Sequence, residues 1–288
     1  MGSAEKIFSN IAIGVFKGFV LEKVITLSNE DLNKINRILI IVRHQMGDFL
    51  CTLPMMLSLR KKFLSAEITL VSKSSAFAKE ILNSCSNNPV DNIYYYEKGF
   101  ENFVNTVKEI KDKNPELAVV PSPVDFSSTN HLIAYYSGAQ YRAGVRSRDY
   151  EKNRIGYVLN IKSDFLWDTK KVHQIERSLD VIRQIGIEPE ENKISLNLNE
   201  DKKNFAAEYF TKNFPERNRP VIGLHTGAAK EQNVWNYEKF AGLMNLLYQK
   251  TGAYFYLSVG PDDKKYSESL TSHLKKKFSR YKICIILR

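Results

Sequence analysis

The stretch ILIIVRHQMGDFLCTLPMMLSLRKKF, residues 38–63, decides the fold class of this 288-residue chain. It opens on five consecutive apolar residues, 38–42, most of them β-branched and without polar alternation. Such a run is typical of a strand that is buried on both faces of a parallel sheet. After a short polar loop, residues 49–63 predict a helix, and Pro54 favours a helix start near that residue.

The same alternation of apolar runs and helical patterns continues along the chain. Further strands are expected over residues 67–71, 92–96 and 117–120, with helices over residues 77–82, 100–113, 130–136 and 173–185, the last ended by Gly186 as a left-handed cap. A second series has strands over residues 221–225, 254–259 and 282–287, and helices over residues 236–249 and 265–278. Strands that alternate with helices predict βαβ units and doubly wound parallel sheets.

Two Rossmann-like domains account for this pattern. A polar stretch with two prolines, residues 212–220, predicts the boundary between them. We expect an N-terminal amphipathic helical segment over residues 1–36, a first domain over 37–215 and a second over 216–288. The second domain shows only three strands, which is short for this architecture and indicates a truncated domain. Residues 145–172 carry no clear period and are expected to be irregular.

Composition and cysteine usage exclude several classes of protein. A hydrophobic content of 43% with 16 Phe and 15 Tyr excludes a disordered chain. The three cysteines form no CxxC pair, which excludes a disulfide scaffold and the usual zinc ribbons. Free thiols indicate a reducing compartment, and we expect a cytoplasmic protein. No run of 18 apolar residues occurs, so the sequence predicts no membrane-spanning helix.

Positive charge is concentrated in the last third of the chain. Residues 201–288 carry 16 Lys and Arg against eight Asp and Glu, whereas the whole chain has a net charge of +10. Such a field fits an anionic partner, for example a nucleotide, a lipid headgroup or nucleic acid. The alternative is a solvated helix face with neutralising charge elsewhere.

The N-terminal segment has an apolar pattern of its own. Residues 5–22 place Ile, Val and Phe side chains at mostly helical spacing, interrupted by Lys6 and Lys17. The segment is too short and too interrupted to span a bilayer. It fits a helix at a membrane interface or a helix packed on the main body, and no cleavage site of a signal peptide follows it.

The first candidate site is the turn that follows the strand at residues 38–42. In parallel α/β sheets, ligands bind beyond the carboxyl ends of the strands. Gly47 lets the backbone approach a ligand closely, and the carboxylate of Asp48 is placed to accept a proton from an incoming hydroxyl. The alternative is that Asp48 is the N-cap of the following helix.

Two loops of the second domain offer sites for a nucleotide. Small residues in HTGAAK, residues 225–230, free backbone N–H groups for a phosphate, and Lys230 adds a positive charge. After the next strand, Asp262 is placed to hold ribose hydroxyls, although the sequence GPD also suits an ordinary turn. No GxGxxG or GxxxxGK[ST] motif, metal-ligand spacing or catalytic triad is visible, and His173 fits a structural hydrogen bond at a helix start.

Four segments together resemble glycosyltransferase family 9, the bacterial lipopolysaccharide heptosyltransferases. They are the stretch at residues 38–63, VHQIERSLDVIRQIGI at 172–187, VIGLHTGAAKEQNVWNYEKFAGLM at 221–244 and LSVGPDD at 257–263. The resemblance implies a GT-B fold, in which one Rossmann-like domain binds the acceptor and the other the nucleotide-sugar. It also implies an inverting, metal-independent transfer of heptose from ADP-heptose to an inner-core sugar, with no cofactor besides the nucleotide-sugar donor.

The resemblance assigns roles to individual residues. Asp48 is implied to be the general base that deprotonates the acceptor hydroxyl. Donor-binding residues are expected at Thr226, Gly227, Ala228, Lys230, Asn233, Gly260 and Asp262, and acceptor-binding residues at Arg43, Met46, Gly47 and Ser122. The lipid-linked acceptor implies peripheral contact with the cytoplasmic face of the inner membrane. No nucleic-acid partner is expected.

Several positions depart from the family's pattern. Asn233 stands two residues before Trp235, where the family has a phosphate-binding lysine, and Ala229 replaces a Ser or Thr. The segment PSP at residues 121–123 replaces an acidic residue, and the later donor motif Asp-[Ser/Thr]-Gly has no counterpart before Arg288. These departures leave open two alternatives, a GT-B glycosyltransferase that uses another nucleotide-sugar and a non-catalytic remnant that binds one.

Overall fold

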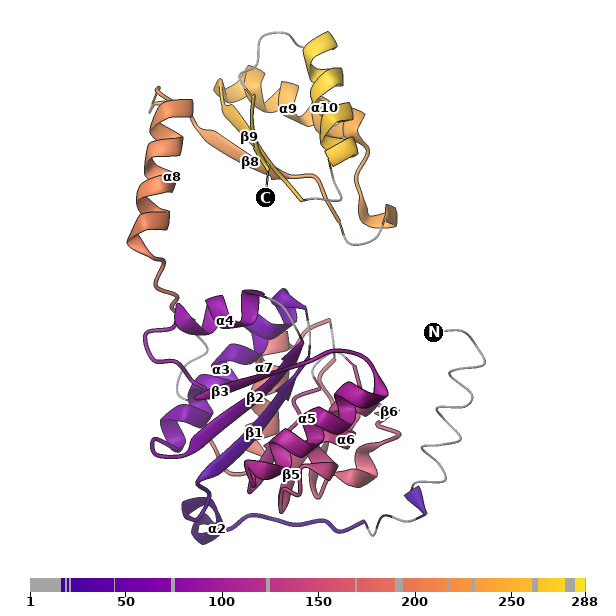
Figure 1. Ribbon diagram of the computed structural model, residues 1–288. Helices are drawn as coiled ribbons and strands as arrows, with labels where there is room; N and C mark the ends of the chain where they lie inside the picture. Colours follow the sequence, from indigo (N-terminus) through magenta and orange to yellow (C-terminus); the bar gives the residue numbers. More distant parts are fainter. Residues whose placement is uncertain are drawn as a thin grey trace. The chain divides into compact units, whose positions relative to one another are not determined.

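The protein consists of two compact units, Met1–Asn197 and Leu198–Arg288. A computed structural model describes residues 17–18, 20, 22–43, 45–73, 76–122, 125–168, 170–189, 194–216, 218–228, 231–260, 264–277 and 283–287. Each unit has its own sheet of mainly parallel strands with helices packed on it (Figure 1). The predicted α/β architecture of two doubly wound units is confirmed.

The first unit contains a seven-stranded sheet in the order β3-β2-β1-β4-β5-β6, with β7 paired to β5. Its strands are β1 (Arg37–Val42), β2 (Glu67–Lys73), β3 (Asn92–Tyr96), β4 (Leu117–Val119), β5 (Tyr141–Arg148), β6 (Glu151–Lys152) and β7 (Ile161–Phe165). The pairings are parallel except that of β5 with β6. The strand order reverses between β1 and β4, which is the switch point where doubly wound sheets bind ligands.

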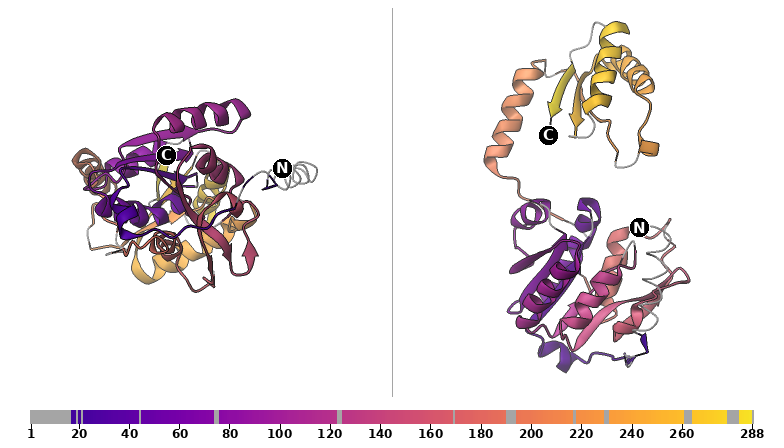
Figure 2. Two further views of the ribbon diagram at one scale, coloured as in Figure 1. Left: turned by 90° about the horizontal axis from the view of Figure 1, so that it is seen from below. Right: turned by 45° about the vertical axis from the view of Figure 1, so that its right-hand side comes forward.

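Helices cover both faces of this sheet, as Figures 1 and 2 show. They are α2 (Asn29–Asn33), α3 (Met46–Lys62), α4 (Ala76–Asn83), α5 (Phe100–Asp112), α6 (Ser128–Tyr136) and α7 (Gln174–Arg183), with a 3₁₀ turn η1 (Gly156–Val158). Alternate residues of β1 enter different cores. Ile38 and Ile40 pack with α3 and α7, whereas Leu39 and Ile41 pack with α5 and α6. The prediction of a strand buried on both faces is therefore confirmed.

The predicted start of α3 and the predicted end of α7 can be compared with the structure. Helix α3 begins at Met46 and contains Pro54, so the predicted start near that proline was wrong. Burial of Phe49 and Leu53 on the sheet stabilises the first turns and outweighs the local preference of proline. Helix α7 ends as predicted, because Gly186 has φ +80° and the N–H of Ile187 donates to the carbonyl of Ile182 in a Schellman motif.

The prediction for residues 145–172 was wrong. This region holds the end of β5, the short strand β6, η1 and the edge strand β7. A two-residue turn joins β5 to β6, and both of its residues, Asp149 and Tyr150, have positive φ. Arg146 on β5 and Asp164 on β7 form an ion pair across the two strands. Polar edge strands of this kind are held by neighbours distant in sequence, so they lack the apolar run that marks a buried strand.

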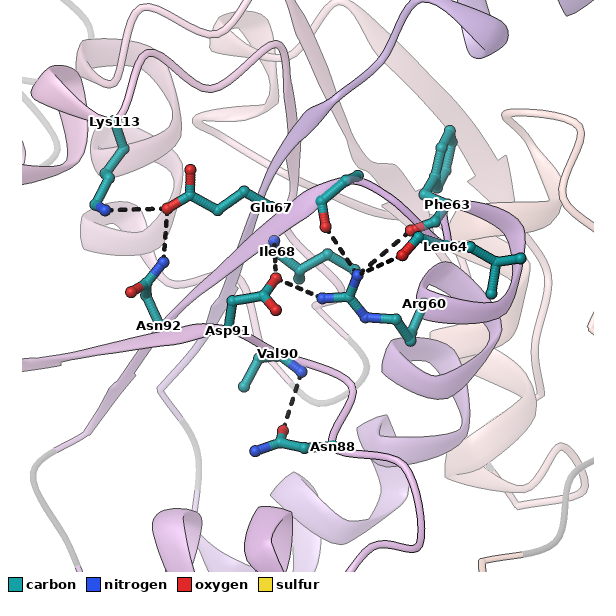
Figure 3. A network of polar contacts seen from close by, with 11 residues as sticks. Arg60, Phe63, Leu64, Glu67, Ile68, Asn88, Val90, Asp91, Asn92 and Lys113 are labelled. Atoms are coloured by element: carbon teal, nitrogen blue, oxygen red, sulfur yellow. Dashed lines mark hydrogen bonds and ion pairs between the residues drawn. The ribbon is translucent and has the colours of Figure 1, made fainter.

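A polar network ties the amino ends of the strands together (Figure 3). The Asp91 carboxylate accepts hydrogen bonds from Arg60 on α3 and, at 2.7 Å, from the backbone N–H of Ile68 on β2. Nearby, the Glu67 carboxylate accepts from Asn92 at 2.7 Å and from Lys113 at 3.0 Å. These bonds join β2, β3 and the end of α5, and they satisfy the backbone at the start of β2.

The second unit contains a three-stranded parallel sheet in the order β10-β9-β8. Its elements are α8 (Glu200–Asn213), β8 (Val221–His225), a 3₁₀ turn η2 (Glu231–Asn233), α9 (Tyr237–Thr251), β9 (Tyr254–Val259), α10 (Lys264–Lys277) and β10 (Ile283–Leu287). Phe255 and Leu257 of β9 form its core with Met244 of α9 and Leu270 of α10.

Helix α8 explains why the unit begins earlier than the boundary expected between residues 215 and 216. The ring of Phe210, in its last turn, lies edge-on to Tyr256 of β9, with 5.7 Å between the ring centroids. Phe214, which follows the helix, contacts Tyr254 of the same strand. The aromatic contacts attach α8 to the second sheet, and Gly223 on β8 leaves room for Tyr256.

The predicted amphipathic helix over residues 5–22 lies almost wholly outside the described residues. In the described part of the segment over residues 1–36, Ser28 caps helix α2 in a capping box with Asp31. Ile25 and Leu27 pack against the first core, and Val20 packs beside Tyr157 and Val158. A search of the described helices finds none long and apolar enough to cross a bilayer.

Candidate functional site

The turn after β1 places four predicted residues at the carboxyl end of the sheet. Arg43 follows the last residue of β1, and Met46, Gly47 and Asp48 form the first turn of α3. The N-cap of this helix is Gln45, which makes no side-chain cap bond, so the alternative that Asp48 is the N-cap was wrong. Asp48 instead lies at the third helical position, where the helix dipole favours a negative charge.

The carboxylate of Asp48 is held by a residue of another helix. Gln174, the first residue of α7, donates a hydrogen bond from Nε2 to Oδ1 of Asp48 at 2.9 Å. The N-termini of α3 and α7 thus both lie at this carboxylate. Within the described parts of the chain, Gln174 is the donor to this carboxylate, which leaves Oδ2 available to a substrate. The half-buried Asp48 can therefore accept a proton there.

The helix that carries Gln174 is fixed by its own cap. His173 is the N-cap of α7, and its Nδ1 accepts a hydrogen bond from the backbone N–H of Ile175 at 3.2 Å. The prediction of a structural role for His173 is confirmed. Along the helix, Leu179 and Ile182 are fully buried in the core that also holds α3. The cap and the packing together set the position of the Gln174 amide.

Arg43 is a half-buried cation beside the same site. Its guanidinium lies 4.0 Å from the centroid of the Tyr96 ring, and Nη1 donates to Oδ1 of Asn130 at 3.2 Å. Its Nε is buried, and no residue in the described ranges gives it a hydrogen-bond partner. Burial lowers the pKa of the Arg43 guanidinium, which nevertheless stays charged at neutral pH. A half-buried cation whose contacts are an aromatic ring and an amide is suited to an anionic or hydroxyl-rich ligand.

The other predicted acceptor residues differ in exposure. Met46 is 49% exposed, and a Cβ placed on Gly47 would meet nothing within 4 Å, so space remains beside the helix start. Ser122 is buried just beyond the end of β4, the strand that pairs with β1 across the switch point. The topology thus brings Arg43, Gly47, Asp48 and Ser122 to adjacent strand ends.

In the second unit, the loop after β8 contains one buried group without a partner. Thr226 is only 2% exposed, and its Oγ1 makes no hydrogen bond in the described structure. An unsatisfied buried hydroxyl costs about 1–3 kcal/mol, so such groups are rare without a reason. Gly227 and Ala228 follow it at the carboxyl end of β8, where a nucleotide is expected to bind.

The remaining predicted donor residues lie in two neighbouring loops of this unit. Asn233 ends the turn η2, and Trp235 after it stacks edge-on against Phe240 of α9 with 4.8 Å between the ring centroids. Gly260 follows β9, the strand that pairs with β8. Lys230 and Asp262 lie outside the described residues. The described members thus gather beyond the carboxyl ends of β8 and β9, as an anion-binding loop requires.

Sequence reasoning missed Gln174 and a buried histidine. His131 on α6 is fully buried, its Nδ1 donates to the carbonyl of Ser127 at 2.7 Å, and its Nε2 lies 2.8 Å from Nδ2 of Asn153. Burial lowers the pKa of His131 to about 4, so the ring is neutral at pH 7 and structural.

The thiol of Cys51, on the same helix as Asp48, is not suited to act as a nucleophile. Burial first, and the charge of Asp48 second, raise the pKa of this thiol, which disfavours the reactive thiolate.

Comparison with known families gives one match. The family model of glycosyltransferase family 9 (heptosyltransferase) matches residues 125–286, more than half of the chain. Curated proteins gave no match. Among the described residues, no group of three His, Cys, Asp or Glu side chains is placed to hold a metal ion.

Solved structures share the fold. A family 9 glycosyl transferase from Veillonella parvula has a TM-score of 0.64 at 17% identity, covering 93% of this chain and 70% of that one. The E. coli ADP-heptose lps heptosyltransferase II has a TM-score of 0.63 at 18% identity, with 87% and 72% covered. E. coli heptosyltransferase WaaC with ADP has a TM-score of 0.58 at 14% identity, with 87% and 74% covered. These likenesses confirm the predicted GT-B type of fold.

Proposed function

The chain belongs to glycosyltransferase family 9 (heptosyltransferase), and on this premise we propose that it transfers heptose from ADP-heptose to an inner-core sugar of lipopolysaccharide. Membership makes it a heptosyltransferase-like glycosyltransferase, which uses a nucleotide-sugar donor and a saccharide acceptor. The observation that carries the finer proposal is the Asp48 carboxylate at the switch point, with Oδ1 held by Gln174 and Oδ2 available to an acceptor hydroxyl.

In the proposed reaction, the acceptor oxygen attacks the anomeric carbon of the heptose from the face opposite ADP. The acceptor proton moves to the carboxylate of Asp48 while the bond between the anomeric carbon and the β-phosphate oxygen breaks. The product therefore has the inverted configuration, and ADP leaves with the electron pair of that bond. A base placed in this way contributes about 10²–10⁴-fold to the rate.

The departing ADP needs positive charge and hydrogen-bond donors, and we propose that the second unit supplies them. Its donors are the buried Thr226 hydroxyl, which has no partner among the described residues, and the loop amides at Gly227 and Ala228. The excess of eight positive charges over residues 201–288 supports this assignment, since a diphosphate is a concentrated negative charge. Asn233, Gly260, Lys230 and Asp262 complete the proposed donor site, and no metal ion is needed.

The acceptor is proposed to bind the first unit through Arg43, Met46, Gly47 and Ser122. A half-buried guanidinium and an open helix start suit an acidic sugar with several hydroxyls. Because the acceptor carries a lipid, the protein is expected to meet it from the cytoplasmic side of the inner membrane. The amphipathic pattern of residues 5–22 supports a peripheral contact there.

The test is ADP release by the full chain with ADP-heptose and a heptose-free inner-core acceptor. Mass spectrometry of the acceptor should show one added heptose, and NMR of the product should show the inverted anomer. EDTA should leave the rate unchanged. Turnover with another nucleotide-sugar in place of ADP-heptose would favour the alternative donor. Binding of ADP without any transfer would favour the non-catalytic remnant.

A further inference from the structure

A pocket of about 1060 Å³ lies in the first unit, at the edge of its sheet formed by β5, β6 and β7. Charged side chains from four separate segments line it: Lys17, Glu22, Arg146, Lys152, Arg154, Lys162 and Asp164. The lining does not include Arg43, Asp48, Ser122 or Gln174. The pocket is therefore separate from the site at the end of β1, although β5 is only two strands away from β1.

The charges in this pocket do not balance. Glu22 pairs with Lys162, and Asp164 pairs with Arg146 through both carboxylate oxygens. The other three cations, Lys17, Lys152 and Arg154, are exposed and lie beyond 4 Å from any described carboxylate oxygen. Lys17 and Lys152 still interact at longer range with Glu22 and Asp164. Five positive and two negative groups thus face one cavity, which gives it a net positive potential.

One cation belongs to the built floor of the pocket. The side chain of Lys162 is 1% exposed, and its ammonium donates to Glu22 and, at 2.9 Å, to the carbonyl of Gly156. An ammonium has three N–H donors, so one remains beyond these two bonds. The hydrogen bond from Lys162 lowers the pKa of Glu22, which keeps that carboxylate charged and Lys162 in place. A buried charge held in this way is rare without a purpose.

An aromatic side chain is presented at the mouth of the same pocket. Tyr150 is 86% exposed at the tip of the β5–β6 turn and has φ +69°, a conformation that costs a tyrosine about 1 kcal/mol or more. The preceding residue Asp149, also at positive φ, is anchored because its N–H donates to Phe165 and its Oδ1 accepts from Asp168. Leu166 on the rim is 69% exposed. The turn thus holds a large ring in solvent beside a basic cavity.

We propose that this pocket binds a phosphate- or carboxylate-bearing saccharide, as a second saccharide site of the first unit. The unpaired cations would receive the anionic group, and Tyr150 would stack on the apolar face of a sugar ring. The pocket includes Arg146 and Asp164 towards the carboxyl ends of β5 and β7, in the sheet that carries Asp48 beyond β1, and the proposal extends to one anionic acceptor that reaches both. The identification of the ligand as the acceptor rests on the proposed function, whereas the binding of an anionic saccharide by the pocket does not.

The experiment measures binding to the full chain by NMR titration with three monosaccharides. Glucose 6-phosphate and glucuronate should bind and shift the amides around Tyr150 and Asn153, whereas glucose should not. The double variant Lys152→Glu/Arg154→Glu should weaken glucose 6-phosphate binding at least tenfold. The matched control Lys108→Glu/Lys111→Glu makes the same charge change at exposed positions of α5 and should bind like the wild type.

Three outcomes would overturn the proposal. The first is equal binding of glucose 6-phosphate by Lys152→Glu/Arg154→Glu and the wild type, and the second is an equal loss of binding in both double variants. The third, from a parallel titration with phosphatidylglycerol vesicles, is binding to the vesicles without binding to either charged monosaccharide. Tyr150→Ala should weaken sugar phosphates but leave inorganic phosphate unchanged, which separates a saccharide site from an anion site. Transfer assays separate the two proposals. If glucose 6-phosphate binds but the chain releases no ADP, only the proposed enzyme function is wrong. If Lys152→Glu/Arg154→Glu transfers heptose normally with an unchanged acceptor KM, the pocket does not bind the acceptor.

Discussion

The two ends of the sheet in the first unit differ in how their polar groups are used. At the amino end, the carboxylates of Glu67 and Asp91 each accept two hydrogen bonds from the protein (Figure 3). The carboxylate of Glu116 accepts from the backbone N–H groups of Asn36 and Arg37. At the carboxyl end, counting the residues that the structure describes, Asp48 accepts one from Gln174, and the buried Nε of Arg43 has no hydrogen-bond partner. At the amino end, the polar groups hydrogen-bond to neighbouring strands and helices. At the carboxyl end, polar atoms of Asp48 and Arg43 remain available to hydrogen-bond a ligand.

The largest expected effect comes from Asp48→Asn. The amide keeps the size of the side chain and an oxygen that can accept from Gln174, but it cannot take a proton. We expect kcat with ADP-heptose to fall about 10²–10⁴-fold while the melting temperature stays unchanged. Wild-type turnover by the variant would show that another group acts as the base.

A second prediction concerns the carboxyl-end group that is fully satisfied, His131. Its folded-state pKa of about 4 lies below the ordinary value of 6.5, so the unfolded chain binds the extra proton first. Stability from this group is complete above pH 6.5 and declines as the pH falls towards 4, by an amount on the order of 3 kcal/mol.

Urea unfolding at several pH values checks this in a Trp235→Phe background, so that the buried Trp167 reports on the first unit. The difference between the wild type and His131→Gln should shrink steadily below pH 6.5. A constant difference over that range would mean that His131 is not the titrating group.

The third prediction concerns the polar network at the amino end of the sheet. Asp91→Ala removes the acceptor of the Ile68 N–H and the partner of Arg60, and it leaves a half-buried backbone donor unsatisfied. We expect the free energy of unfolding of the first unit to fall by about 2 kcal/mol, with kcat unchanged. Reduced kcat at full folding would contradict the division of roles between the two ends.

Much of the fold follows from the sequence, for a physical reason. A strand buried on both faces must be continuously apolar, which is why residues 38–42 identify β1. Strand β7 is an edge strand with polar side chains such as Lys162 and Asp164, and its place depends on pairing with β5. The start of α3 escaped local rules because burial of Phe49 outweighs the preference of Pro54.

The candidate site was predictable only in part. The loop after a buried strand pointed to Asp48 through topology alone. Gln174 lies 126 residues away along the chain, and its contact depends on how α7 packs against α3. The Thr226 hydroxyl is buried and has no hydrogen-bond partner in the described ranges, and no local sequence pattern encodes this burial. Contacts between distant segments are thus the part that the sequence leaves undetermined.

The fourth prediction sharpens the role of Gln174 as a positioning residue. Gln174→Leu removes the donor to Asp48 at similar volume, and we expect kcat to fall about tenfold. The loss should fall on kcat and leave the acceptor KM close to the wild-type value, because Gln174 contacts the carboxylate of Asp48. Gln184→Leu is the matched control, because Gln184 donates to Gly144 and Val181 at the other end of α7. Equal kcat losses in both variants, or a rise in acceptor KM as large as the fall in kcat, would reduce Gln174 to a packing role.

The smallest expected effect is that of a buried hydroxyl in the second unit. Thr226→Val removes a buried hydroxyl for which the described part of the chain offers no partner, so the unliganded unit should gain up to about 1 kcal/mol of stability. If that hydroxyl binds the donor, ADP affinity measured by calorimetry should fall about fivefold, equivalent to about 1 kcal/mol. Thr251→Val is the matched control, because the Thr251 hydroxyl donates to Leu247 and accepts from Ala253. It should lose stability and leave ADP affinity unchanged. The opposite signs arise because one hydroxyl is reserved for a ligand and the other belongs to the fold, so a loss of stability in both variants would place Thr226 in the fold as well.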